Sequence, residues 1–354
     1  MAKTWVVLVN WNGGDDTIEC LEALLRLDAD DFAVVIVDNG STDGSVEAIA
    51  AWAHSAPAAF SSPVWSRLPA TRVQDKRLAI IDAANPLPPP AAGITLIRAG
   101  RNLGFAGANN LGMAFARGDP DLAWYWILNN DTVVAPDSLA IQVARMTADP
   151  GIGMLGARLM FYHEPDVVQG LAGGFFRLRA RGYHIGMGEP GPAPAPAPAA
   201  AEADMRYVLG ASMFVRARLV DRIGGMDERY FLYFEELDWA RRMPRDQRLA
   251  IAPEAVVWHK EGGSIGSSTR NRPSDTSLYY INASLLRFYW RHDRALIPIA
   301  IGRVLREALS LAKQGDLAGA RAIRRAAGDV LRGIRRQGRY GSAEFEAAAA
   351  EGAR

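Results

Sequence analysis

The sequence contains a single cysteine, Cys20, among its 354 residues. A disulfide framework needs paired cysteines and a cysteine-based zinc site needs several, so both are excluded. A chain of this length can bury enough apolar surface to fold without them. Its 40 Lys and Arg residues nearly balance its 39 Asp and Glu residues, so we expect no nucleic-acid partner from the overall charge.

Long apolar runs are also missing. A membrane-spanning helix needs about 20 apolar residues, and a secretory signal peptide needs a basic start before its apolar stretch. The first apolar run, residues 5–9, ends at Asn10, and a later one, residues 295–302, contains Pro298. We therefore expect a cytoplasmic protein whose membrane contact is at most peripheral, on the inner face of the cell membrane.

Two common nucleotide-binding motifs are absent: G-x-G-x-x-G after the first expected strand, and the P-loop G-x-x-x-x-G-K-[ST]. The first strand is followed instead by Asn-Trp-Asn-Gly-Gly at residues 10–14. Trp11 offers a flat face on which a base can stack, and Asp38 offers an acceptor for an imide N–H. These residues favour a pyrimidine nucleotide, although Trp11 could equally belong to the core.

Short β-branched runs alternate with helix-period segments over the first 150 residues. This alternation predicts βαβ units around a mainly parallel sheet. Residues 54–93, with scattered Pro, Ser and Ala, are expected to form a surface insertion, and residues 189–204 an Ala/Pro-rich loop. The Gly- and Asn-rich residues 102–110 are expected to form a loop before a helix.

Polar turns follow three of the expected strands, at residues 10–12, 38–40 and 129–131. Each turn alone is typical of an Asx turn or a helix cap. In an open parallel sheet, however, ligands bind outside the carboxyl ends of the strands. The three turns and the 102–110 loop together therefore predict one ligand site at this edge.

Six segments occur in a fixed order: VVLVNWN, VDNGSTD, NLGFAGANN, LNND, GGMDERYFLYFEELD and VWH. Together they resemble the inverting family 2 glycosyltransferases, and within them the bacterial rhamnosyltransferases and galactofuranosyltransferases. The resemblance covers roughly residues 4–260. It implies an α/β protein with a GT-A fold over residues 1–265, in which helices flank a Rossmann-like mixed, mainly parallel sheet.

The resemblance also implies a dTDP- or UDP-linked sugar donor held by Mg²⁺ or Mn²⁺. Family members bind the cation through an Asp-x-Asp-type motif, which corresponds here to residues 129–131, where the last position alone is a carboxylate. The implied metal ligands are Asp131 and His259. The implied donor-nucleotide contacts are Val9, Trp11, Asp38, Asn102, Gly104, Asn109 and Asn130.

The base in this family is an acidic residue at the start of a helix, matched here by Glu-Glu-Leu-Asp at residues 235–238. By position Glu236 corresponds to the base, while Glu235 and Asp238 would hold sugar hydroxyls. The implied acceptor contacts are Gly210, Tyr233 and Trp239. In isolation the same segment is typical of a charged helix start over an aromatic core.

Residues 294–354 hold 12 Lys and Arg against 6 Asp and Glu, which leaves a net charge of −5 for the rest. We expect a basic helical extension over residues 266–340 and a disordered tail over residues 341–354. Its apolar and arginine-rich helices could contact anionic lipid. Alternatively, they pack on the catalytic domain or on a second subunit of a homo-oligomer.

The implied reaction is the inverting transfer of a sugar, with rhamnose expected, to a saccharide or polyprenyl-linked saccharide in cell-surface polysaccharide synthesis. Two other functions stay open. The incomplete acidic motif at residues 129–131 also fits a catalytically silent subunit that binds a nucleotide-sugar. A sugar nucleotidyltransferase would need a basic Gly-rich loop after the first strand, which residues 12–15 do not provide.

Overall fold

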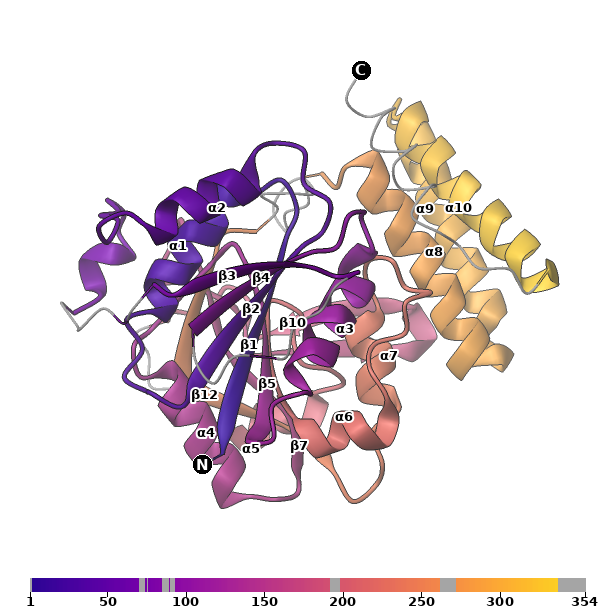
Figure 1. The fold of residues 1–354 in the computed structure, drawn as a ribbon. Helices are drawn as coiled ribbons and strands as arrows, with labels where there is room; N and C mark the ends of the chain where they lie inside the picture. The colour runs from indigo at the N-terminus through magenta and orange to yellow at the C-terminus, as the bar shows by residue number, and fades with distance from the viewer. Residues whose placement is uncertain are drawn as a thin grey trace.

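The computed structural model describes residues 2–69, 74, 76–84, 89, 93–191, 198–261 and 272–336. Ten of the described strands form one central sheet (Figure 1). They are β1 (Lys3–Asn10), β2 (Phe32–Asp38), β3 (Leu78–Asp82), β4 (Gly93–Arg98), β5 (Leu122–Asn129), β6 (Thr132–Val134), β7 (Ile152–Phe161), β8 (Val168–Gly170), β11 (Ser212–Arg216) and β12 (Arg248–His259).

The strand order is β3-β4-β2-β1-β5-β11-β7-β12-β6, with β8 paired to β7. The first five strands run parallel to one another. Strand β11 is antiparallel to both of its neighbours, β5 and β7, whereas β7 and β12 are parallel to each other. The sheet is therefore mixed and mainly parallel, as predicted.

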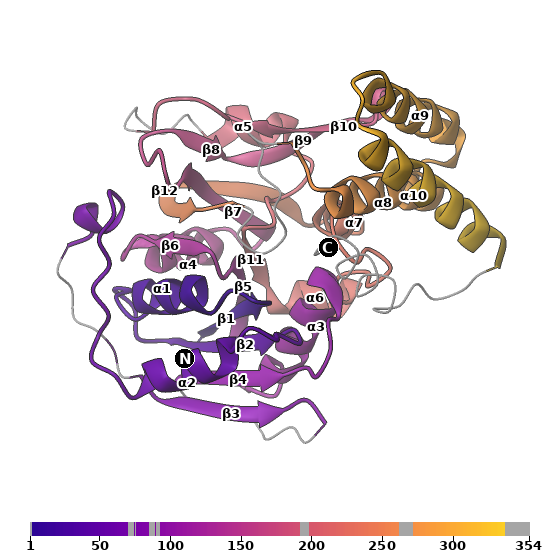
Figure 2. The same ribbon diagram turned by 90° about the horizontal axis from the view of Figure 1, so that it is seen from above.

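Helices cover both faces of the sheet (Figure 2). Side chains of β1 alternate between the faces: Trp5 packs on Phe115 of one helix layer, with ring centroids 5.7 Å apart, while Asn10 bonds to Thr17 of the other. The Thr17 side carries α1 (Gly14–Leu24), α2 (Ser45–Ala53) and α4 (Ser138–Ala148). The Phe115 side carries α3 (Gly104–Ala116), α6 (Ala217–Ile223) and α7 (Glu235–Arg241).

A second, two-stranded sheet of β9 (Ala172–Phe176) and β10 (Arg181–Ile185) is joined at its tip by the 3-10 turn η2 (Arg177–Arg179). Arg206 and Tyr207 run beside it, since the Arg206 N–H donates to Gly173 O at 2.8 Å. The Tyr207 ring covers Gly173, where a Cβ would lie 2.1 Å from the ring. This small sheet lies next to the C-terminal helices (Figure 2).

The C-terminal helices α8 (Asp275–His292), α9 (Ile297–Lys313) and α10 (Leu317–Arg336) pack on one another (Figure 1). Helix α8 joins them to the rest of the described chain: Tyr280 stacks on Phe231 at 5.0 Å, and the Ser284 hydroxyl donates to Leu232 O at 2.9 Å. In the part of the chain that the structure describes, no helix is long and apolar enough to span a membrane. The predicted tail, residues 341–354, lies outside the described residues.

Three local predictions were wrong in part. The 54–93 insertion contains β3, an edge strand that hydrogen-bonds to β4. This strand was not recognised from the sequence because its outer side chains are exposed. Residues 104–110 belong to α3 rather than to a loop. Residues 198–204 of the Ala/Pro-rich segment form α5 (Pro198–Asp204), while residues 192–197 lie outside the description.

Candidate active site

The polar ends of β1, β2 and β5 are joined by one hydrogen-bond network. Asn10 Nδ2 donates to Asp38 Oδ1 at 2.9 Å, and Asn10 Oδ1 accepts from the Thr17 hydroxyl at 2.8 Å. Asn130 Nδ2 donates to the same Thr17 hydroxyl at 2.9 Å. The predicted convergence of these turns is therefore confirmed. Thr17, one turn into α1, was missed because a helical threonine gives no functional signal.

A second network holds the start of α3 against β2. Asn102 Oδ1 accepts from the Gly104 N–H at 2.9 Å and from Asn39 Nδ2 at 3.0 Å, while Asn39 Oδ1 accepts from the Leu103 N–H at 2.7 Å. These bonds satisfy backbone donors at the helix start. They explain why a Gly- and Asn-rich segment is helical here. Asn39 lies in the predicted 38–40 turn but was not among the implied donor contacts.

Gly104 is required for a close backbone approach. Its φ is +73°, and a Cβ there would lie 2.6 Å from Phe231 O. The next residue, Phe105, donates its N–H to the same oxygen at 2.9 Å. The predicted donor-binding loop is therefore bonded directly to the segment that precedes α7.

The remaining predicted donor contacts have different environments. Val9 lies in β1 between Val37 and Asn129, and Trp11 is half-buried and packs partly against the core. Asn109 is 1% exposed, and its Nδ2 donates to Phe105 O within α3 at 2.9 Å. The Nδ2 donor of Asn109 is therefore used within α3.

Asp131 and His259 meet where β5 leads into β6 and β12 ends. Their Oδ1 and Nε2 atoms are 3.2 Å apart, and Gln169 Oε1 lies 3.0 Å from the other imidazole nitrogen, Nδ1. Burial alone lowers the pKa of the His259 imidazole, but the Asp131 carboxylate outweighs it and the pKa is raised. Burial likewise opposes ionisation of Asp131, yet His259 and Lys260 lower the pKa of its carboxyl.

Glu235 and Glu236 begin α7, directly after two residues with positive φ, Tyr233 at +66° and Phe234 at +71°. Non-glycine residues in this region are strained, and such strain is concentrated at functional sites. One carboxylate oxygen of each glutamate is buried without a hydrogen-bond partner among the described residues. Burial raises the pKa of Glu236 to about 7, and burial together with the Glu236 charge raises the pKa of Glu235.

The segment Tyr207–Ala211 connects the glutamates to the strand ends. Tyr207 lies close enough to Glu236 for that carboxylate to add to the effect of burial and raise the pKa of its hydroxyl. Ala211 O accepts the Asn129 N–H at 3.0 Å. Gly210 lies between them, with open space where a side chain would project. Residues 207–211 therefore link the surroundings of Glu236 to the end of β5, two residues before Asp131.

The family model described as Glycosyl transferase family 2 matches residues 5–62 and 74–187. The chain belongs to glycosyl transferase family 2. The match includes the three strand ends and Asp131, whereas Glu235, Glu236 and His259 lie beyond it.

Similar proteins agree with this assignment. The glycosyltransferase is 26% identical over 277 residues to the N-acetylglucosaminyl-diphospho-decaprenol L-rhamnosyltransferase of Mycobacterium tuberculosis (strain ATCC 25618 / H37Rv), covering 74% of this chain and 77% of that protein. The identical scores hold for the protein of the same name from strain CDC 1551 / Oshkosh.

Two solved structures share the fold. S. aureus TarS 1-349 in complex with UDP-GlcNAc aligns with a TM-score of 0.53 at 13% identity, over 93% of this chain and 80% of that chain. Mannosyltransferase PcManGT from Pyrobaculum calidifontis, in complex with GDP-Man and Mn²⁺, aligns with a TM-score of 0.50 at 16% identity, over 99% of this chain and 79% of that chain. These likenesses support the GT-A fold that the sequence predicted.

Two residues of the glycosyltransferase lie away from the positions expected for sugar contacts. Trp239 is fully buried, and its Nε1–H donates to Gly224 O at 2.9 Å, so its ring cannot stack on an acceptor sugar. Asp238 is also fully buried and accepts from Arg242 Nε at 2.9 Å, with His292 Nε2 at 2.6 Å from its other oxygen. Asp238 turns away from Glu236 because α7 rotates about 100° per residue. Trp239 lies nearer the Glu236 face of the helix, but packing and the bond to Gly224 O hold its ring in the core.

Tyr233 stays half-buried, and its hydroxyl lies 3.1 Å from the Ser277 hydroxyl of α8. Gln169 and Tyr207 were missed by sequence analysis because neither belongs to a motif. Their roles depend on contacts between segments that are about 30 to 90 residues apart in the chain.

The Asp131–His259 pair is suited to a divalent cation. Two neighbouring ligands of an octahedral ion at about 2.1 Å lie about 3 Å apart, close to the observed 3.2 Å. Gln169 can fix the imidazole orientation, as outer-shell partners of metal-bound histidines do. The described residues contain no cluster of three or more His, Cys, Asp or Glu side chains that could hold a metal ion.

Proposed function

We propose that this glycosyltransferase transfers rhamnose, with inversion, from a dTDP- or UDP-sugar to a saccharide carried on a lipid diphosphate, during synthesis of a cell-surface polysaccharide. The rhamnosyltransferase relative supports the sugar and the acceptor class. The observation that carries the mechanism is the half-buried Glu236 at the start of α7, one carboxylate oxygen of which has no hydrogen-bond partner among the described residues. Its pKa of about 7 suits a general base at neutral pH.

In the proposed step, Glu236 accepts the proton of an acceptor hydroxyl. The acceptor oxygen then bonds to the anomeric carbon while the bond from that carbon to the donor diphosphate breaks, and the electron pair leaves with the diphosphate. Attack on the face opposite the leaving group inverts the configuration. Glu235 and the open space at Gly210 would position the acceptor beside Glu236.

Asp131 and His259 would hold Mg²⁺ or Mn²⁺, which supplies charge stabilisation to the departing diphosphate. The Asn10, Asp38, Asn102 and Asn130 networks would form the wall against which the nucleotide binds. The PcManGT complex, which contains GDP-Man and Mn²⁺, supports a donor and cation of this class.

The C-terminal helices are the proposed contact with the inner face of the cell membrane. Leu305 and Leu309 of α9 lie one turn apart and are 52% and 63% exposed, with Arg306 beside them. An apolar stripe next to cations suits anionic lipid. A homo-oligomer that buried the same stripe would instead show as a dimer in analytical ultracentrifugation.

The proposed function is tested by incubating the protein with dTDP-rhamnose or UDP-sugars, Mg²⁺ and a lipid-linked N-acetylglucosamine acceptor. We expect release of the nucleoside diphosphate and a product whose new linkage has the inverted configuration by NMR. A retained configuration would contradict the mechanism, and absence of release from every donor would favour a silent binding subunit. Family membership leaves no support for a nucleotidyltransferase.

A further inference from the structure

A pocket lies beside α7, which contributes Leu237, Ala240 and Arg241 to its wall. Its volume is about 260 Å³, just below the roughly 300–1,000 Å³ of typical small-ligand sites. Apolar side chains from β9, α7 and α8, those of Phe175, Leu237 and Phe288, form part of its wall. Nothing in the proposed mechanism uses this pocket.

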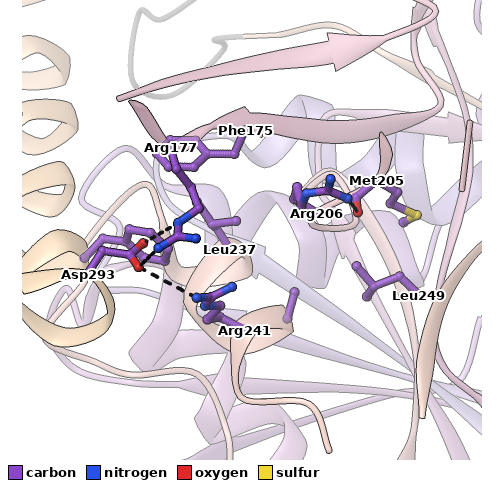
Figure 3. Close-up of a pocket in the computed structure, with 10 residues that line it drawn as sticks. Phe175, Arg177, Met205, Arg206, Leu237, Arg241, Leu249 and Asp293 are labelled. Atoms are coloured by element: carbon purple, nitrogen blue, oxygen red, sulfur yellow. Dashed lines mark hydrogen bonds and ion pairs between the residues drawn. The ribbon is translucent and has the colours of Figure 1, made fainter. Parts of the chain in front are cut away.

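Three arginines line the pocket, against one carboxylate. Arg177 and Arg241 converge on Asp293 at one end, while Arg206 lies at the other end (Figure 3). Arg177 Nε donates to Asp293 Oδ2 at 3.1 Å, and Arg241 Nη2 lies 3.7 Å from Oδ1. The lining therefore has an excess of two positive charges beside an apolar wall, which suits a ligand with both an anionic and an apolar part.

The pocket wall and the surroundings of the proposed base share two segments of the chain. Leu237 follows Glu236 directly in α7. Arg206 precedes Tyr207, whose hydroxyl has a pKa raised by burial and by the Glu236 charge. The donor networks lie instead at the ends of β1, β2 and β5. A ligand in the pocket would thus approach Glu236 from the acceptor side.

Exposed apolar side chains lie close in the chain to Arg177 and Asp293. Phe176 and Leu178, which flank Arg177 in the chain, are 45% and 72% exposed. Trp290, one helical turn before Asp293, is 40% exposed, and the Arg294 guanidinium lies 5.1 Å from its ring centroid. A long apolar chain that leaves the pocket here would meet an apolar surface.

We propose that this pocket binds the diphosphate and the first part of the apolar chain of a lipid-linked acceptor. Arg206 and Arg241 contact the diphosphate, and Phe175, Leu237 and Phe288 contact the chain. This inference rests on the proposed function, since it deepens the acceptor class. It places the saccharide of the acceptor next to Glu236.

The test is a calorimetric titration of the full chain with geranyl diphosphate, inorganic pyrophosphate and geraniol. Saturating dTDP and Mg²⁺ keep the donor site filled. We expect geranyl diphosphate to bind at least about tenfold more tightly than either fragment. Arg206→Gln and Arg241→Gln should each weaken it about tenfold, as expected for losing one charge-assisted hydrogen bond. Arg245→Gln, which removes an exposed charge outside the pocket, should leave it unchanged.

Equal affinity for pyrophosphate and geranyl diphosphate would overturn the lipid assignment in favour of a free anion. Unaltered binding of geranyl diphosphate in Arg206→Gln and Arg241→Gln would overturn the assignment of the binding site to this pocket. Thermal melting would confirm that both variants are folded. In the transfer assay, the two variants should raise the acceptor KM with the donor KM unchanged. The calorimetric titration needs no turnover, so it tests the pocket separately from the proposed function. Geranyl diphosphate could fail to bind while sugar transfer is observed, and it could bind while no transfer is observed.

Discussion

Two pairs of largely buried ionisable groups lie at the candidate site, and the pKa values of Asp131 and Glu235 shift in opposite directions. Asp131 has an imidazole 3.2 Å away, so its pKa is lowered despite burial. Glu235 has another carboxylate as its neighbour, so burial and like charge act together and its pKa is raised. Burial is common to both pairs, and the neighbouring charge decides the direction. One pair suits holding a cation and the other suits exchanging a proton.

The largest expected effect comes from removing the proton acceptor. Glu236→Gln keeps the side-chain shape but cannot take up a proton, so we expect kcat to fall by about 10³-fold, with dTDP and Mg²⁺ binding unchanged by calorimetry. Glu254→Gln, an exposed carboxylate in β12, is the matched control. Full activity in Glu236→Gln would remove this residue from the mechanism.

The second prediction concerns a substitution that breaks the Asp131–His259 pair. Asp131→Asn should weaken Mg²⁺-dependent donor binding by about 10²-fold, by analogy with losses seen when metal sites are disturbed. It also removes the carboxylate that raises the pKa of His259, so burial should then bring that pKa below its usual value. NMR titration of the imidazole checks the second outcome; an unchanged His259 pKa would show that the pair is not coupled.

The third prediction concerns pH. Glu236 must be ionised to act as a base, so kcat/KM should fall about tenfold per unit below pH 7 and reach a plateau above it. A profile measured from pH 5 to 9 tests this. A midpoint near 4.5, the ordinary value for glutamate, would mean that burial does not control the base.

The smallest effect is on stability. The raised pKa of Glu235 means that the folded protein favours its protonated form, so its contribution to stability is fully present below about pH 4.5 and is lost as pH rises through the folded pKa. Glu235→Gln should therefore stabilise the protein on the order of 1 kcal/mol at pH 8, and have little effect at pH 4. Thermal melting at both values measures it, and equal shifts would point to a packing effect.

The sequence predicted the sheet, the convergence of the strand ends and the acidic start of α7 because these depend on local patterns. It did not predict the environments of Asp238 and Trp239, since helix rotation and packing against α8 decide which side chains of residues 235–239 are buried. It missed β3, whose stability comes from β4. Gln169 and Tyr207 were missed because tertiary contacts alone bring them to the site.

The contact between Gly104 and Phe231 limits how this enzyme can change its specificity. Any side chain at position 104 would collide with Phe231 O, so this part of the proposed donor wall and the aromatic segment before Glu235 cannot diversify independently. New donor preferences are therefore easier to engineer at Trp11, which is half-buried and packs partly against the core. Libraries should vary that position while residues 104 and 231 stay fixed.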